Sequence, residues 1–168
     1  TMAVIADKCP HLHITVLDIN EQRISDWNNK DCDNLPVYEP GLKDIIKRVR
    51  GKNLFFSTQI KQIIAQSEMV FISVNTPTKE KGFGAGYASD LKWVESSARQ
   101  VAKYATNHTI VVEKSTLPVK TAQVIKQILE NLGFQSPDKT DKTFSILSNP
   151  EFLAEGSAIN DLNEPDRV

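Results

Sequence analysis

The sequence predicts an α/β fold with a doubly wound, mostly parallel sheet, and two features lead to this expectation. Short apolar segments typical of buried strands alternate with amphipathic segments of helical spacing along the whole chain. The apolar segments 69–74, 109–112 and 144–147 each end at a polar, proline-marked tip. Such alternation predicts βαβ units with right-handed crossovers. Because ligands of open parallel sheets bind at the carboxyl ends of strands, we expect the function to lie in these three tips.

Each strand is expected where large or β-branched apolar residues form a run too short for a helix. In chain order these strands cover 13–18, 54–56, 69–74, 109–112 and 144–147. Each helix is expected where apolar residues recur at helical spacing beside a suitable end residue, such as Asn20 as an N-cap or Gly51 at a C-terminus. In chain order these helices cover 1–8, 21–28, 40–50, 58–64, 90–105 and 118–133. We expect a mobile loop over 79–88 and a loop or short helices over 152–161.

Composition excludes several classes of partner. The 168 residues suit one domain, and the formal net charge of −1, with acids and bases interspersed, argues against nucleic acid or a membrane surface. No apolar run is long enough to span a bilayer. Cys9 and Cys32 suggest neither a disulfide framework nor a metal site, so we expect reduced thiols in a cytoplasmic protein. The histidines His11, His13 and His108 are scattered, which argues against a bound metal.

Asp18 closes the first predicted strand and is the most informative single residue. In dinucleotide-binding folds, a carboxylate at the end of the second strand accepts hydrogen bonds from the adenosine ribose, about 20 residues after a Gly-rich turn. At this spacing the Gly-x-Gly-x-x-Gly turn and the first strand would precede Thr1, so we expect the chain to lack both. The alternative is that Asp18 only caps the following turn. An aspartate here favours NAD over NADP, and Arg23 weakens that preference.

Polar side chains also follow the later strands at their carboxyl ends. Asn75, Thr76 and Thr78 are suited either to contact ribose or pyrophosphate, or to form a turn without a ligand. Ser115 and Thr116 lie where a strand passes into a helix. They are expected either to bind an anion or a polarised water, or to act as ordinary N-cap hydroxyls.

Charged residues gather at the same strand ends. Glu113 and Lys114 end a predicted buried strand, where they are expected to pair with each other or with neighbours. Glu151 and Glu155 are four residues apart and would share one face of a helix, although Pro150 leaves the helix open to question. Two carboxylates near a crevice can divide general-base and binding work; otherwise they are solvated acids.

Six runs of the chain together resemble the UDP-glucose/GDP-mannose dehydrogenase family. They are NLPVYEPGL over 34–42, GKNLFFST over 51–58, VFISVNTPT over 70–78, VEKST over 112–116, LSNPEFLAEG over 147–156 and PDRV over 165–168. The resemblance covers nearly the whole chain. The runs at the last two strand tips are long and specific, far more so than a lone glycine pattern.

The resemblance implies a Rossmann-like NAD-binding domain over residues 1–168, cut at both ends from a longer protein. It implies oxidation of the C6 alcohol of UDP-glucose to the carboxylate of UDP-glucuronate, with two hydride transfers to two NAD+. A second domain would supply a lysine and a cysteine nucleophile that forms a covalent adduct, and a central helix would form a homo-oligomer. Neither Cys9 nor Cys32 matches that nucleophile, so the chain alone is expected to be inactive.

The resemblance also assigns roles to residues at the strand tips. Asp18 and Arg23 would contact the adenosine ribose. The cofactor would further be lined by Val74, Asn75, Thr76, Pro77, Thr78, Ser115, Thr116 and Glu155. The sugar nucleotide would be contacted by Glu151, Phe152, Leu153, Ala154 and Glu155. Glu151 would act as acid and base in thioester hydrolysis, and Thr116 would help to hold the water.

Two alternatives stay open at this point. The first is a related dehydrogenase that acts on a UDP-N-acetylhexosamine. The second is a non-catalytic nucleotide-sensing module that kept the fold. Segments 30–34 and 136–142 look longer than in the family, and both are polar, so we expect them to be surface loops.

Overall fold

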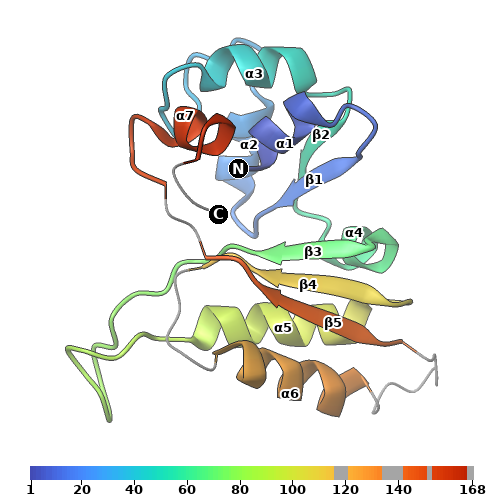
Figure 1. Ribbon diagram of the computed structural model, residues 1–168, viewed down its shortest axis with the longest axis vertical. Coiled ribbons are helices and arrows are strands. Elements are labelled where there is room, and N and C mark those ends of the chain that lie inside the picture. Colours follow the sequence, from blue (N-terminus) through green and yellow to red (C-terminus); the bar gives the residue numbers. More distant parts are fainter. Residues whose placement is uncertain (116–120, 134–141, 151–152, 166–168) are drawn as a thin grey trace. The chain divides into compact units, whose positions relative to one another are not determined.

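The computed structural model describes residues 1–115, 121–133, 142–150 and 153–165. The chain divides into two compact units, Thr1–Ile60 with Phe152–Val168, and Lys61–Glu151. Helices alternate with strands in both units, and every described strand pair is parallel (Figure 1). The predicted alternation of helices and parallel strands is therefore confirmed.

The first unit contains a two-stranded parallel sheet, in which β1 (Ile14–Leu17) pairs with β2 (Leu54–Ser57). Its helices are α1 (Met2–Lys8), α2 (Glu21–Asn28), α3 (Leu42–Val49) and α7 (Ala158–Asn163). The start of α2 is fixed by Asn20, whose side chain accepts a hydrogen bond from the backbone N–H of Arg23, as predicted for an N-cap.

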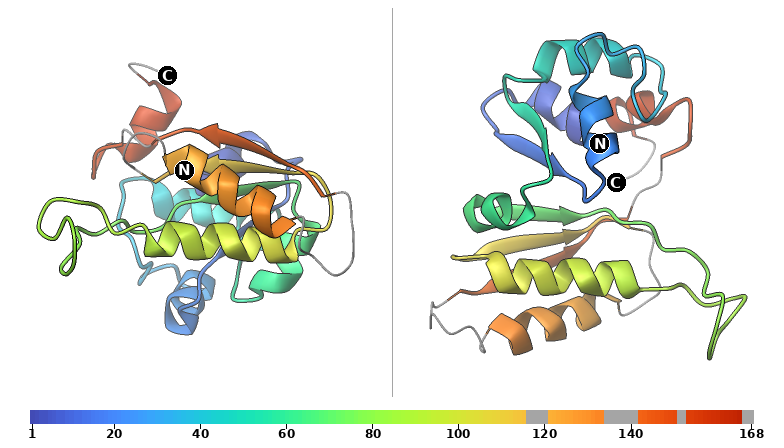
Figure 2. Two further views of the ribbon diagram at one scale, coloured as in Figure 1. Left: turned by 90° about the horizontal axis from the view of Figure 1, so that it is seen from below. Right: turned by 180° about the vertical axis from the view of Figure 1, so that it is seen from behind.

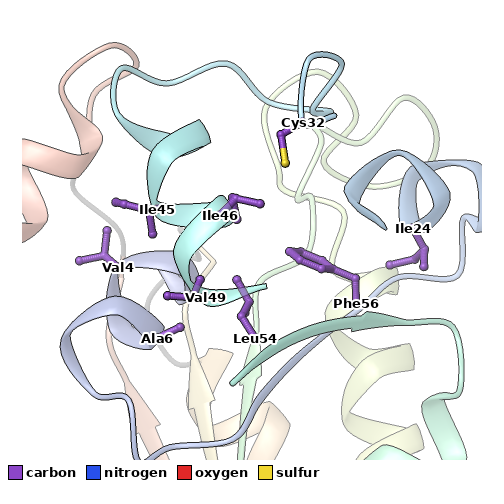
Figure 3. Packing of buried hydrophobic residues seen from close by; sticks show 9 residues of the cluster. All are labelled: Val4, Ala6, Ile24, Cys32, Ile45, Ile46, Val49, Leu54 and Phe56. Carbon is purple, nitrogen blue, oxygen red and sulfur yellow. The ribbon is translucent and has the colours of Figure 1, made fainter. Parts of the chain in front are cut away.

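The core of the first unit forms where the apolar faces of these elements meet (Figure 3). The buried members are Val4, Ala6, Ile24, Cys32, Ile45, Ile46, Val49, Leu54 and Phe56. Removing each large aliphatic side chain from water contributes about 1.5–3 kcal/mol. The ring of Trp27 stacks on that of Phe56, with their centroids 5.0 Å apart. This packing holds β1 and β2 in place and thereby fixes the position of the residues at their carboxyl ends.

The second unit contains a three-stranded parallel sheet in the order β3 (Met69–Ile72), β4 (Thr109–Glu113), β5 (Phe144–Ser148). Helices α5 (Lys92–Tyr104) and α6 (Thr121–Gly133) pack on each other and cover one face of this sheet (Figure 2). The helix α4 (Ile60–Gln66) leads into β3. The side chains of Val94, Ala98, Val101, Val111, Val112, Ile125 and Leu129 are buried in this unit.

Several predicted boundaries were wrong by a few residues. The strand predicted over 69–74 ends at Ile72, whereas the strands predicted to end at 112 and 147 continue to Glu113 and Ser148. Pairing explains the extension, because Glu113 is in register with both Ile72 and Ser148. The helix predicted over 40–50 begins at Leu42, after Gly41 in a left-handed conformation (φ 81°). The start predicted at residue 118 for α6 lies outside the described residues.

The segment 79–88 is a loop, as predicted, and it is closed by backbone hydrogen bonds. Thr78 and Ser89 form an antiparallel bridge, and the N–H of Lys79 donates to the carbonyl of Ala88 at 2.7 Å. Gly84 has a φ of 86°, and a Cβ added there would lie 2.7 Å from the Cβ of Ala88. No helix among the described residues is long and apolar enough to cross a membrane.

Candidate functional site at the strand tips

Asp18 follows β1 directly, and its carboxylate is fixed by two local contacts. Its Oδ1 accepts a hydrogen bond from the N–H of Asn20 at 2.9 Å, and its Oδ2 accepts one from Arg23 Nη1 at 3.3 Å. The Asp18 side chain is 26% exposed. A carboxylate has about four acceptor positions, so these contacts leave capacity for ribose hydroxyls. Asp18 therefore caps its turn, as the alternative reading proposed, and still has the chemistry that an NAD ribose requires.

The tip after β3 is joined to the tip after β4 by a pair of hydrogen bonds. Ser115 Oγ accepts from the N–H of Val74 at 3.0 Å and donates to the carbonyl of Val74 at 2.8 Å. Ser115 is buried. These two predicted site residues, 41 positions apart, thus lie in direct contact. The contact fixes where the chain turns away from the sheet at the two neighbouring strand ends.

The residues that follow β3, 74–78, are exposed to solvent to different extents. Asn75, Pro77 and Thr78 are exposed, whereas Val74 and Thr76 are half-buried. Asp90 closes the base of the loop that follows this tip, because its N–H donates to the carbonyl of Pro77 at 2.7 Å. An accessible set of short polar groups on a fixed backbone suits the ribose and pyrophosphate of a dinucleotide.

The Asp90 carboxylate also contacts Lys92, the first residue of α5. Its Oδ1 accepts from the N–H of Lys92 at 3.0 Å, and its Oδ2 lies 3.2 Å from Lys92 Nζ. The backbone hydrogen bond from Lys92, followed by its side chain, holds the pKa of the Asp90 carboxyl below its ordinary value of 3.8. The lowered pKa favours the ionised form of the Asp90 carboxyl, which pairs with Lys92.

Glu113 lies at the end of β4 and is buried. Its Oε2 accepts a hydrogen bond from Ser148 Oγ at 2.9 Å, and its carbonyl accepts from the N–H of Asn149 at 2.9 Å. The N–H of its neighbour Lys114 donates to the carbonyl of Ile72 at 2.9 Å. The expectation that these charged residues bond to neighbours is confirmed for Glu113, and the contacts tie the three strand ends together.

Three predicted site residues, Thr116, Glu151 and Phe152, lie outside the described residues. The other members of the last tip belong to the first unit, where Leu153 is half-buried and both Ala154 and Glu155 are exposed. Glu155 lies in a turn, and α7 begins after it at Ala158.

Sequence reasoning missed two carboxylates that bond to the backbone of this turn, Glu39 and Asp161. Glu39 accepts hydrogen bonds from the N–H groups of Gly156 and Ala158, and Asp161 accepts one from the N–H of Ala154. The Glu39 contact spans 117 positions, so no local pattern predicts it. Gly156 itself was a usable signal for the turn, because glycine readily adopts the left-handed conformation (φ 86°) found there.

The predicted site residues thus form two groups, one in each unit. Asp18, Arg23 and the residues 153–155 belong to the first unit, and 74–78 with Ser115 belong to the second. Among the described residues, no three His, Cys, Asp or Glu side chains form a group that could hold a metal ion.

The whole chain, residues 1–168, matches the NAD binding domain of the UDP-glucose/GDP-mannose dehydrogenase family. It is 54% identical to UDP-glucose 6-dehydrogenase 1 of Oryza sativa subsp. japonica and 55% identical to UDP-glucose 6-dehydrogenase 4 of Arabidopsis thaliana, in each case over 168 residues. These alignments cover 100% of this chain and 33% of each relative. The chain therefore spans about a third of the length of the curated relatives that it matches.

Solved structures agree with this assignment. A UDP-glucose dehydrogenase from the archaeon Pyrobaculum islandicum matches with a TM-score of 0.81 and 29% identity, over 99% of this chain and 36% of the other. A GDP-mannose dehydrogenase from Pseudomonas aeruginosa matches with a TM-score of 0.77 and 26% identity, over 97% of this chain and 36% of the other. These matches confirm the doubly wound, Rossmann-like fold. The chain belongs to the UDP-glucose/GDP-mannose dehydrogenase family, as its NAD binding domain.

Proposed function

We propose that this chain is the NAD-binding part of an enzyme that oxidises the C6 alcohol of UDP-glucose to the carboxylate of UDP-glucuronate. One observation carries the proposal: the chain is 52–55% identical over all 168 residues to UDP-glucose 6-dehydrogenases. By contrast, it is 26% identical to the structurally similar GDP-mannose dehydrogenase. We therefore assign UDP-glucose as the substrate, because the relatives with the higher sequence identity are UDP-glucose 6-dehydrogenases.

In the proposed site, Asp18 and Arg23 contact the adenosine ribose, and Asp18 accepts hydrogen bonds from its hydroxyls. The cofactor is further lined by Val74, Asn75, Thr76, Pro77, Thr78, Ser115, Thr116 and Glu155. The described contact between Ser115 and Val74 supports this assignment, because it fixes the backbone that these residues share. When bound, NAD+ supplies the chemistry of accepting a hydride from the sugar carbon.

The sugar nucleotide is proposed to contact Glu151, Phe152, Leu153, Ala154 and Glu155. The complete oxidation removes two hydrides from C6, consumes one water and releases three protons, which leaves a carboxylate. Glu151 would accept and return protons while water attacks a thioester, and Thr116 would hold that water. The cysteine that forms the thioester would come from another part of the full-length protein.

We further propose that residues 1–168 act as one NAD-binding domain of a cytoplasmic homo-oligomer. The structural matches that cover 97–99% of the chain support treating it as one domain. Cys9 and Cys32 are both free thiols, which is typical of proteins in a reducing compartment.

The proposal is tested by the substrate preference of the full-length protein. Initial rates of NADH formation are measured with UDP-glucose, GDP-mannose and UDP-N-acetylmannosamine at matched concentrations. We expect kcat/KM to be highest with UDP-glucose. A higher value with either of the other two sugar nucleotides would assign the protein to another substrate. Nucleotide binding without NADH formation from any of them would indicate a sensing module.

A further inference from the structure

A single carboxylate, that of Glu39, accepts two backbone hydrogen bonds from the far end of the chain. Its Oε2 lies 2.9 Å from the nitrogen of Gly156, and its Oε1 lies 2.8 Å from the nitrogen of Ala158. Both oxygens are thus used, each by a different N–H. Glu39 and its partners all belong to the first unit. Hydrogen bonds to an ionised acceptor are shorter and stronger than neutral ones, so this contact is a strong restraint on the turn.

A second carboxylate restrains the other side of the same turn. Asp161 Oδ2 accepts from the N–H of Ala154 at 3.2 Å and from Ser157 Oγ at 2.9 Å. The turn over residues 154–158 therefore has three of its backbone N–H groups bonded to carboxylates. Gly156 adopts a φ of 86°, which side-chain-bearing residues rarely adopt. The conformation of the turn is thereby specified by contacts on both sides.

The segment that contains Glu39 is itself anchored in the unit. Gly41 has a φ of 81° and starts α3, and a Cβ added to it would lie 3.8 Å from Ile159 Cδ1. Ile159 and Leu162 of α7 pack against the core cluster. Glu39 is half-buried, so solvent competes only partly for its oxygens. The carboxylate and the turn are therefore held together by packing as well as by hydrogen bonds.

Glu155 lies inside this turn, directly before Gly156. The Gly156 N–H belongs to the peptide group that joins Glu155 to Gly156, so the bond to Glu39 fixes the orientation of that peptide group. The side chain of Glu155 is exposed. Glu155 is therefore an exposed carboxylate on a turn that is held from both sides. A side chain held in this way is pre-organised to contact a ligand.

We propose that Glu39 is a positioning residue, which fixes the Glu155 turn so that Glu155 is ready to contact cofactor and substrate. This inference rests on the proposed function, because that function gives Glu155 its role. Glu39 itself touches the backbone of the turn and acts through it. Loss of its charge should loosen the turn and lower ligand affinity together.

The restraint is tested by amide hydrogen exchange in the full-length protein without ligand. In the wild type, the amides of Gly156 and Ala158 should be protected. In Glu39→Gln, one acceptor oxygen is replaced by an NH2 group and the other loses its charge, so exchange of at least one of the two amides should accelerate roughly tenfold or more, as expected when a hydrogen bond to a charged group is lost. The Ala154 amide, bonded to Asp161, should stay protected. Unprotected Gly156 and Ala158 amides in the wild type would overturn the proposal even if the variant fails to fold.

The link to Glu155 is tested by a double-mutant cycle that measures the Kd for NAD+ by titration, together with kcat and KM for UDP-glucose. Glu39→Gln and Glu155→Gln should each weaken binding, and the double variant should be little worse than either alone, because one residue acts through the other. Glu130→Gln is the matched control, since Glu130 is exposed and forms only an i,i+4 pair with Lys126 among the described residues. Fully additive losses would overturn the positioning role.

The two proposals fail in different ways. Normal amide protection with no oxidation of UDP-glucose by the wild type would refute the proposed function and leave the Glu39 restraint in place. Oxidation of UDP-glucose by a protein whose Glu39→Gln variant keeps wild-type exchange and affinity would refute the role of Glu39 alone.

Discussion

At the scale of single residues, Asp18 and Asp7 each bond an arginine, and the two contacts serve different purposes. Asp18 lies at a strand end with a single hydrogen bond to Arg23, at 3.3 Å. Asp7 forms two hydrogen bonds with Arg48, at 3.0 and 2.9 Å, which join α1 to α3. The carboxylate of Asp18 bonds to residues of the turn that follows it and keeps acceptor positions for a ligand, whereas that of Asp7 joins two helices through a bidentate contact with one arginine.

Asp18→Asn is expected to weaken NAD+ binding. The amide keeps the size of the side chain and removes the charge and one acceptor oxygen, so hydrogen bonds from ribose hydroxyls are lost or weakened. We expect the Kd for NAD+ of the full-length protein to rise by about tenfold or more, measured by titration. Asp26→Asn, a matched change on helix α2 at a carboxylate that accepts a hydrogen bond from Gln22, should leave the Kd unchanged. An equal Kd for Asp18→Asn and the wild type would remove Asp18 from the site.

The ion pair between Asp7 and Arg48 should make stability depend on pH. Hydrogen bonding from Arg48, the largest cause, holds the pKa of Asp7 below its ordinary value of 3.8. A lowered pKa in the folded state adds stability above that ordinary value, and the contribution is lost as the pH falls through the folded-state pKa. The difference in denaturant midpoint between wild type and Asp7→Asn should therefore be constant near neutral pH and vanish in acid. A difference that does not shrink as the pH falls below the ordinary value of 3.8 would contradict this assignment.

At the scale of secondary-structure elements, the sequence predicted which segments are strands and helices because burial imposes a periodic pattern. The run around Val70–Ile72 is apolar on both sides, and α3 places Ile45, Ile46 and Val49 on one face. Strand ends were harder to predict. The extension of β4 to Glu113 depends on Ser148 of β5, which lies 35 positions away in the sequence.

Ser115→Ala tests the contact that joins the tips of β3 and β4. Both the N–H and the carbonyl of Val74 would lose their partner in a partly buried place, which costs on the order of 1–3 kcal/mol for each unsatisfied group. We expect a lower denaturant midpoint and a higher Kd for NAD+ in the full-length protein. Ser96→Ala, an exposed change on α5, is the control. A destabilised variant with unchanged NAD+ affinity would show that the contact is structural only.

At the scale of the whole molecule, the family was predicted correctly from short sequence runs, several of them at strand tips, whereas the contacts that support those tips were not predicted. Asp18 was predicted as a site residue from its place at a strand end, and the structure confirms that place directly after β1. Glu39 was not found as a site residue, because its partners Gly156 and Ala158 lie 117 and 119 positions away. Contacts of this length depend on how the unit folds, and no periodicity in one sequence encodes them.

The number of NADH molecules formed for each UDP-glucose consumed by the full-length protein tests the proposed function most directly. Oxidation of an alcohol to a carboxylate removes two hydrides, so we predict two NADH and one UDP-glucuronate for each UDP-glucose. The measurement follows NADH absorbance to completion with limiting substrate, together with analysis of the sugar nucleotide. One NADH with an aldehyde product, or no NADH from a protein that binds both nucleotides, would contradict the proposed function.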